Sequence, residues 1–301
     1  MLENDLKLFG HLTKDVYFKD KTSIRIGGKM KYFIEVDEIK SLQNLIKYLN
    51  NNEISYFVLG NGTNLLVSDE DFDIVVISLK RMNKMRYENE IFIIEAGVNA
   101  MPCGTKITLL GYMPPLCLAM VPGTIGGAIY MNASAYGEDV KKYLQAVDYI
   151  TPQGELIHLN DLKDFGYRAS PFQTNSGIIV RGYFKFDKDN NRKNVDLLQK
   201  AWAHKKNTQP LKTKNAGCIF KNPPSKPAWN FIKRNNLDKI KIGDAAVSEK
   251  HHNFLINLGE ATFFEMHALI EYIQKRVYEN DNELLELEIR ILKPQDIIPY
   301  Q

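Results

Sequence analysis

Apolar residues recur in two rhythms along the first hundred residues, and each rhythm predicts a different kind of element. A helix is predicted over 41–50, where the apolar residues keep the spacing of one helical face. Short runs rich in β-branched and aromatic residues predict strands at 32–36, 56–60, 65–67, 74–79 and 91–95. The charged segment 80–90 is interpreted as a connection, so this part combines strands, one helix and a glycine turn.

The middle of the chain continues the strand pattern. Runs at 147–150 and 155–159 flank Thr151-Pro-Gln-Gly154, which is a turn sequence, and together they predict a hairpin. The run 177–186 predicts a further strand. The charged and Asn-rich segment 187–196 that follows is interpreted as a domain boundary.

The C-terminal part closes with a helix and a strand. Thr262 and Glu265 have capping-box spacing and start a helix predicted over 263–279, with an apolar stripe on one face. The final run, 286–292, alternates as a strand does, so its charged residues are expected to share one face.

One long stretch between Lys106 and Glu138 carries no charged residue. About 20 apolar residues suffice to span a bilayer as a helix, but the prolines and glycines here would interrupt one. Within the stretch, Val121–Gly127 holds three glycines, and small residues follow it. Backbone without side chains lets a flat ligand lie against peptide groups, so we interpret the stretch as the floor of a cofactor site.

Composition narrows the class of protein. The chain has 301 residues, 44% of them hydrophobic and 25% charged, with a net charge of +3, which is ordinary for globular proteins of two or three subdomains. The sequence contains no block of basic residues interleaved with aromatic residues, which is the pattern that would suggest nucleic-acid binding. The N-terminus lacks the apolar core of a secretory signal, and three cysteines without metal-like spacing suit a reducing compartment. We expect a cytoplasmic protein without a metal ion or membrane insertion.

Two glycine-rich segments are candidate nucleotide sites. Gly60-Asn-Gly-Thr-Asn64 follows a strand, and its consecutive N–H groups suit phosphate oxygens, although a plain hairpin turn explains the same residues. Val121–Gly127 is equally compatible with a tight corner between strands. Two such segments in one domain favour a dinucleotide, one holding its diphosphate and the other facing a ring.

Three side chains are candidates for chemistry, each with an ordinary alternative. Arg168 lies among aromatic residues and suits a carboxylate clamp or a stacked surface position. Cys218, which small residues precede, is either a proton donor or an inert buried thiol. Glu288 is a candidate carboxylate, but spacing alone does not distinguish it from Glu286.

Taken together and in order, these segments resemble the bacterial UDP-N-acetylenolpyruvoylglucosamine reductases. The resemblance covers about Thr22 to Leu292, nearly the whole chain. The segments that carry it are Arg25–Gly28, Gly60–Val67, Val121–Gly127, Tyr167-Arg168, Asn215–Pro223, Val247–His251 with Asn253-Phe254, and Leu285–Arg290. Each is weak alone, and their shared order makes the resemblance specific.

The resemblance implies an FAD enzyme that uses NADPH to reduce an enolpyruvyl ether in peptidoglycan precursor synthesis. It implies Arg168, Cys218 and Glu288 as catalytic residues, with Cys218 as the proton donor. The implied cofactor-binding residues are Gly60, Asn61, Gly62, Thr63, Asn64, Leu65, Pro122, Gly123, Thr124, Gly126 and Gly127. The implied substrate-binding residues are Asn222, Arg290 and, more loosely, Lys206.

The resemblance also implies an α+β fold of the vanillyl-alcohol-oxidase type, with two FAD-binding subdomains and a C-terminal substrate-binding domain. We assign 1–80 to the first subdomain, joined by a C-terminal strand in 284–301, 81–195 to the second, and 196–283 to the substrate domain. We expect a monomer with non-covalently bound FAD, of the shorter type of the family. The alternative is a sugar or alcohol oxidase of the same fold, with Cys103 or Cys117 as a conceivable flavin attachment.

The chain departs from the usual pattern of the family at a few positions. Ser134 stands where a Gly is usual, in the segment Asn132-Ala-Ser-Ala-Tyr-Gly137. The other departures are Pro115, Cys117, Trp229 and Leu237. None of them removes Arg168, Cys218 or Glu288, but they bear on how the flavin and the substrate are contacted.

Overall fold

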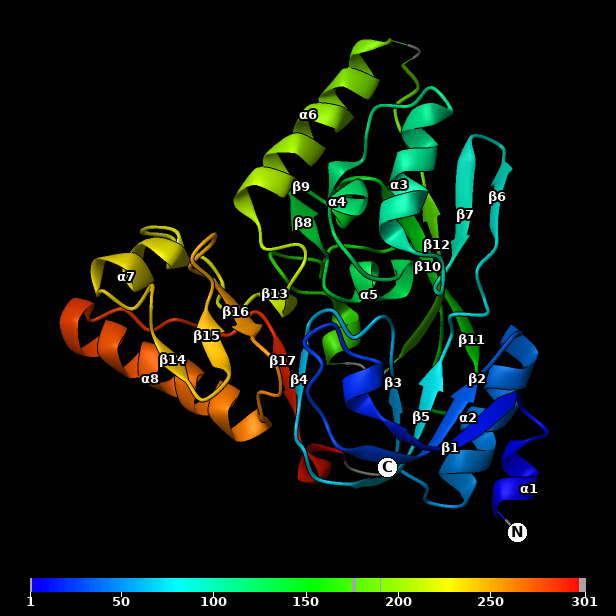
Figure 1. Cartoon of the computed structure of the whole chain (residues 1–301). Coiled ribbons are helices and arrows are strands. Elements are labelled where there is room, and N and C mark those ends of the chain that lie inside the picture. The colour runs from blue at the N-terminus through cyan, green and yellow to red at the C-terminus, as the bar shows by residue number, and fades with distance from the viewer. Residues whose placement is uncertain (1, 175–176, 190, 298–301) are drawn as a thin grey trace.

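The computed structural model describes residues 2–174, 177–189 and 191–297. Figure 1 shows three parts: a blue and cyan part from the N-terminal residues, a mainly green part, and a yellow and orange C-terminal part. Each part contains a sheet with helices packed against it, as the predicted α+β fold requires.

The first part is a four-stranded sheet in the order β1-β2-β5-β3. Helix α2 lies where the apolar spacing predicts a helix, and its buried residues are those of the predicted face. The neighbouring strand β4 pairs in parallel with β17 at the end of the chain, so this C-terminal strand does join the first part. The elements are α1 Leu2–Leu6, β1 His11–Tyr17, β2 Lys29–Glu35, α2 Ile39–Asn51, β3 Tyr56–Val58, β4 Leu65–Val67 and β5 Phe72–Ser78.

The second part is a five-stranded antiparallel sheet in the order β11-β10-β12-β7-β6. The predicted hairpin is confirmed as β10 and β11, whereas the connection expected at 80–90 contains the additional strand β6. The strands are β6 Met85–Glu88, β7 Ile91–Glu95, β8 Ser134–Ala135, β9 Glu138–Asp139, β10 Leu144–Ile150, β11 Leu156–Leu159 and β12 Ile178–Phe184; the helices are α3 Ala100–Leu109, α4 Leu116–Ala119 and α5 Ile125–Tyr130.

The uncharged stretch forms short helices rather than one long element. It contains the end of α3, all of α4 and α5, and the start of the β8–β9 hairpin. In the described part of the chain, no helix is both long and apolar enough to cross a bilayer. The glycine-rich segment is a loop only as far as Thr124, because α5 begins at Ile125 and includes Gly126 and Gly127.

The third part packs two helices against a four-stranded sheet in the order β13-β16-β15-β14. Its long helix α8 begins with the predicted capping box, in which Thr262 and Glu265 bond each other's main-chain N–H groups. The elements are β13 Lys214–Cys218, α7 Ala228–Arg234, β14 Lys241–Ile242, β15 Ala245–Val247, β16 Phe254–Asn257 and α8 Phe263–Asp281.

Helix α6, Lys193–Thr208, was not expected, because its first residues fall in the segment interpreted as a domain boundary. Its buried residues Leu198 and Ala201 share an apolar cluster with Leu116 and Met120 of the second part. This packing favours a boundary after α6 instead of at residue 196.

The predicted final strand 286–292 is wrong in its first half, since β17 comprises only Arg290–Leu292. The side chain of Glu286 is 68% exposed, whereas that of Glu288 is 14% exposed, so the two carboxylates do not share one environment. The preceding residues instead approach the end of β13, with an isolated antiparallel bridge between Phe220 and Leu287.

Candidate active site

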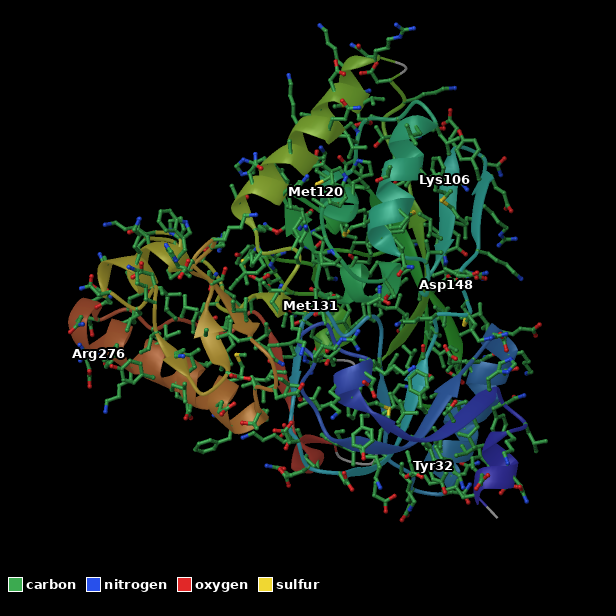
Figure 2. All side chains as sticks on the ribbon, viewed as in Figure 1. Tyr32, Lys106, Met120, Met131, Asp148 and Arg276 are labelled. Carbon is green, nitrogen blue, oxygen red and sulfur yellow. The ribbon has the colours of Figure 1, made fainter. Side chains whose placement is uncertain are left out.

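One cavity of about 830 Å³ lies where the three parts of the chain meet. All residues predicted from the glycine turn and the glycine-rich loop line it, and so do Arg168, Cys218, Glu288 and Arg290. In Figure 2 the labelled Met131, which also lines the cavity, lies between the C-terminal part and the other two. The structure therefore brings both proposed nucleotide segments and all three candidate catalytic residues to one place.

The glycine turn between β3 and β4 presents bare backbone to the cavity. Gly62 has a φ of +60°, and a Cβ on it would lie 2.5 Å from the carbonyl oxygen of Lys21, so a side chain does not fit there. The N–H groups of residues 60–64 donate no hydrogen bond to any described residue. A run of unsatisfied N–H groups beside a cavity is suited to binding an anion such as a diphosphate.

The glycine turn and the glycine-rich loop contact each other directly. The Thr63 hydroxyl donates to the carbonyl oxygen of Pro122 at 3.0 Å. A Cβ on Gly60 would lie 2.9 Å from Oγ1 of Thr124, which caps helix α5 by accepting from the N–H of Gly127. The two predicted nucleotide segments therefore form one continuous surface.

Each glycine of the loop is suited to its position for a different structural reason. Gly123 has a φ of +140°, which other residues rarely adopt. A Cβ on Gly126 would lie 2.9 Å from that of Ala96, so this position is needed for packing. A Cβ on Gly127 would find ordinary space and would occupy the wall of the cavity. The free N–H groups and this bare wall fit a dinucleotide with a flat ring system.

Arg168 lies in a strained turn that projects its side chain into the cavity. Gly166 and Ala169 form the two hydrogen bonds of an isolated antiparallel bridge, with Tyr167 and Arg168 between them. Arg168 has a φ of +55°, a conformation that favours glycine. Strained backbone of this kind persists where the surroundings enforce it, often at functional sites.

The surroundings of this turn hold it from both sides. Asn132 Nδ2 donates to the carbonyl oxygen of Gly166 at 2.8 Å, and Gln173 Nε2 donates to that of Arg168 at 3.0 Å. The Ser170 hydroxyl donates to the carbonyl oxygen of Tyr130 at 2.7 Å. The turn is thereby fixed to helix α5 and to the segment after it.

Arg168 and Glu288 form a buried ion pair. Nε of Arg168 lies 2.9 Å from Oε1 of Glu288, and the two side chains are 16% and 14% exposed. Among the described residues, Nε has no partner in hydrogen-bond geometry, so its contact with Glu288 is electrostatic in character. Burial raises the pKa of Glu288 and the nearby Arg168 guanidinium partly offsets that rise.

Glu288 reaches this position through main-chain pairing with the third part. Its N–H donates to the carbonyl oxygen of Ile219 at 2.8 Å, and its own carbonyl oxygen accepts from Asn64 Nδ2 at 3.0 Å. The first bond places Glu288 beside the end of β13, where Cys218 lies. The second ties Glu288 to the glycine turn.

Cys218 is a partly buried thiol beside this pair. Burial, followed by the charge of Glu288, raises the pKa of the Cys218 thiol to about 12, and the positive charges of Arg168 and Lys205 act in the opposite direction. The thiol therefore keeps its proton at neutral pH. The neighbouring Gly217 has a φ of +84° and open space around it, which leaves this side of the thiol without a covering side chain.

The predicted substrate-binding residues are placed differently. Arg290 lines the cavity, and its guanidinium lies 5.1 Å from the ring centre of Tyr130. Asn222 lies outside the lining, where its side-chain oxygen accepts from the N–H of Ala228. Lys206 is exposed and also outside the lining, whereas its neighbour Lys205 is buried in the cavity wall.

Lys205 is a charged cavity residue that the sequence interpretation missed. Its ammonium group donates to the carbonyl oxygen of Met120 at 2.8 Å and to Gln209 Oε1 at 2.9 Å. Burial lowers the pKa of Lys205. The helical spacing of Leu198, Ala201 and Lys205 was a signal that could have found it, because this spacing places Lys205, not Lys206, on the buried face of α6.

The comparisons with known proteins agree with this geometry. A family model described as an FAD binding domain matches residues 30–160, and one described as the C-terminal domain of UDP-N-acetylenolpyruvoylglucosamine reductase matches residues 209–292. A protein of that name from Protochlamydia amoebophila is 36% identical over 295 residues, covering 97% of each chain. The chain belongs to the UDP-N-acetylenolpyruvoylglucosamine reductase family.

Further members of the reductase family support the assignment. The protein of that name from Caldanaerobacter subterraneus is 36% identical and covers 94% of each chain. The crystal structure of the reductase from Thermus caldophilus superposes with a TM-score of 0.80 at 29% identity, covering 94% of this chain and all of that one. The resemblance inferred from the sequence and the FAD-binding α+β fold are thus confirmed.

The oxidase alternative is less supported than membership of the reductase family. Cys103 and Cys117, the two conceivable attachment points for a covalent flavin, are buried and lie outside the cavity lining. Both cysteines pack into a hydrophobic cluster that the first and second parts share, so both have a structural explanation.

Proposed function

We propose that this protein reduces the enolpyruvyl ether of UDP-N-acetylglucosamine to UDP-N-acetylmuramate, with FAD as cofactor and NADPH as hydride donor. The observation that carries the proposal is the meeting of Arg168, Glu288 and Cys218 in the same cavity as the glycine turn and the bare loop. A cation, a carboxyl group and a protonated thiol are the groups that reduction of a double bond beside a carboxylate requires.

The turn at Gly60–Leu65 would hold the diphosphate of FAD, and Pro122–Gly127 would line its ring system. When bound there, FAD would supply the hydride-transfer chemistry between NADPH and the outer carbon of the enolpyruvyl group. The residues of the chain then have two remaining tasks, which are to stabilise the charge that develops and to deliver a proton.

Arg168 performs the first task. Hydride addition to the outer carbon leaves negative charge on the inner carbon, next to the substrate carboxylate, and a cation there stabilises it. The Nη2 group of Arg168 donates no hydrogen bond to any described residue, so its two N–H groups are available for this carboxylate. Glu288 holds Arg168 from the Nε side.

Cys218 performs the second task. Its thiol gives a proton to the inner carbon, a C–H bond forms as the S–H bond breaks, and the thiolate then recovers a proton from solvent. Because the pKa of the thiol is raised to about 12, the group is protonated before the reaction and the thiolate is readily reprotonated after it.

The substrate and NADPH would occupy the cavity in turn, because a single flavin face must serve both half-reactions. Arg290 and Lys205 are basic residues of the lining suited to their phosphates, whereas Asn222 and Lys206 lie outside the lining and would contribute only if their segments moved on binding. We also propose a monomeric, cytoplasmic protein that acts in peptidoglycan precursor synthesis, and through it in cell shape and division.

An absorption spectrum of the purified protein tests this function. We expect the bands of oxidised flavin, bleached by NADPH without oxygen and restored by the enolpyruvyl sugar nucleotide. The proposal would be contradicted if NADPH reduced the flavin and the enolpyruvyl sugar nucleotide did not reoxidise it. Yellow colour that stays with the acid-precipitated protein would instead favour an oxidase with covalently attached flavin.

A further inference from the structure

Ser134 is a position at which the chain departs from the usual pattern of the resemblance, and it contacts Arg168 directly. Nη1 of Arg168 donates to the Ser134 hydroxyl oxygen at 2.8 Å and to the Ser134 carbonyl oxygen at 3.2 Å. A glycine at this position would offer the carbonyl oxygen alone. The hydroxyl therefore adds a second acceptor for the cation that the proposed reaction depends on.

Ser134 lies at the start of a tight β-hairpin. It begins strand β8, which pairs with β9 through a two-residue turn in which Tyr136 and Gly137 both have positive φ, at +55° and +80°. This combination is the tight hairpin turn that matches strand twist. Asn132, just before the strand, binds both Asp139 of β9 and the turn that carries Arg168.

The contacts on Arg168 fix the plane of its guanidinium. Nη1 is hydrogen-bonded to Ser134, Nε faces Glu288 in the ion pair, and the centre of the Tyr167 ring lies 5.6 Å from the guanidinium carbon. A planar group held at two of its nitrogens has its third nitrogen aimed in a set direction. Without the hydroxyl, Nη1 keeps only its hydrogen bond to the Ser134 carbonyl oxygen. The guanidinium then rotates more freely about its contact with Glu288.

We propose that Ser134 is a positioning residue that orients Arg168, so that Nη2 faces the carboxylate of the substrate. This inference rests on the proposed function. Ser134 acts through Arg168, because the hydroxyl makes its one side-chain hydrogen bond among the described residues to that guanidinium. The role is therefore specific to ligands that carry the carboxylate.

The test compares two nucleotides that differ in this group. UDP-N-acetylmuramate carries the carboxylate, and UDP-N-acetylglucosamine lacks it. Dissociation constants are measured by calorimetry for the flavin-loaded wild type, Ser134→Ala, Ser134→Gly and Ser134→Thr. Ser225→Ala is the matched control, because it also removes a hydroxyl bonded to a charged partner, Glu283, and both residues lie outside the cavity lining.

We expect Ser134→Ala and Ser134→Gly to bind the carboxylate-bearing nucleotide roughly tenfold more weakly, since a hydrogen bond to a charged group is lost. Binding of the other nucleotide should be unchanged, and Ser134→Thr should restore the wild-type ratio. In stopped-flow, flavin reduction by NADPH should keep its rate while reoxidation by the enolpyruvyl nucleotide slows.

Equal weakening for both nucleotides, or no weakening for either, would overturn the positioning role of Ser134. Failure of Ser134→Thr to restore the ratio would overturn it as well. A wild-type protein that binds neither nucleotide would contradict the proposed function itself, so the two failures are distinguishable.

Discussion

The hydroxyl of Ser23 donates a hydrogen bond of 2.6 Å to the carbonyl oxygen of Asn215, three residues before Cys218. The N–H of Ser23 donates to the carbonyl oxygen of Gly62 at 3.0 Å, and a loop of the first part thus joins the glycine turn to the third part. The cavity depends on this connection, because its walls come from both sides of it.

Ser23→Ala should loosen the connection without emptying the cavity. Losing one partly buried hydrogen bond costs about 1 kcal/mol, which lowers the melting temperature by roughly 2–4 °C in a protein of this size. Calorimetry of the flavin-loaded protein measures this, with Ser225→Ala as the control. A melting temperature equal to that of the control would show that Ser23 does not stabilise the joint.

Substitution of Cys218 should affect one half-reaction and leave the other unchanged. In Cys218→Ala, flavin reduction by NADPH is expected to continue while reoxidation by the enolpyruvyl nucleotide stalls, because the proton donor is missing. Cys218→Ser should keep most turnover, since a hydroxyl also delivers a proton. Normal reoxidation by Cys218→Ala in stopped-flow would remove the proton-donor role.

The pH dependence of reoxidation follows from the same thiol. An acid donates only in its protonated form, which dominates below its pKa. With the pKa of Cys218 raised to about 12, the reoxidation rate should not fall between pH 7 and about pH 9.5, as it would for an ordinary thiol. Stopped-flow rates across this range check the prediction, and a fall centred near pH 8.5 would contradict it.

Glu288→Gln removes the charge that pairs with Arg168 and keeps the shape. We expect kcat to fall by about a hundredfold or more, the range seen for positioned acid–base groups, with the flavin still bound. The flavin spectrum and steady-state kinetics are measured on the same sample. Loss of the flavin from this variant would assign Glu288 to the structure of the site rather than to the reaction.

Two adjacent lysines offer a direct comparison of a buried and an exposed cation. Lys205→Met removes the ammonium group in the cavity wall, and KM for the nucleotide substrate or for NADPH should rise roughly tenfold. Lys206→Met, one residue along the helix, should change either value less than twofold, because Lys206 points to solvent. The reverse result would restore the sequence-based choice of Lys206.

Gly127→Ala tests the bare wall of the cavity. The added methyl group meets ordinary space, and Ala in a helix is favoured over Gly by about 0.5–1 kcal/mol, so the flavin-free protein should melt no lower than the wild type. FAD affinity should fall, because the methyl group enters the cavity wall. Unchanged FAD binding in a titration followed by fluorescence would show that this glycine does not face the cofactor.

The sequence predicted correctly those helices and strands whose formation depends on their own residues rather than on distant contacts. Helix α2, the β10–β11 hairpin and the capped start of α8 follow from apolar spacing, turn residues and the Thr262–Glu265 pair. Strand β6 was missed because three of its four residues are exposed and two are charged, and its pairing with β7 compensates for a weak intrinsic pattern.

The candidate site was predicted through motifs and resemblance rather than through spacing. Glu286 and Glu288 are equivalent in an alternating strand, and only the tertiary pairing of Glu288 with Ile219 separates them. The same is true of Ser134, whose significance depends on a turn 34 residues further along the chain. Contacts of this kind are set by the packing of distant segments, which no local window of sequence contains.

Three hydrogen bonds between the first part and the C-terminal residues have main-chain oxygens as acceptors. Ser23 binds Asn215, Asn257 binds Ile24, and Asn64 binds Glu288, in each case through a side-chain donor and a carbonyl oxygen. A carbonyl oxygen is present whatever residue carries it, so only one partner of each contact is constrained in sequence. A chimera that takes its C-terminal segment from a distant relative, with the crossover near Gln209, should therefore keep the contacts that Ser23 and Asn64 donate, because both donors stay in the first part.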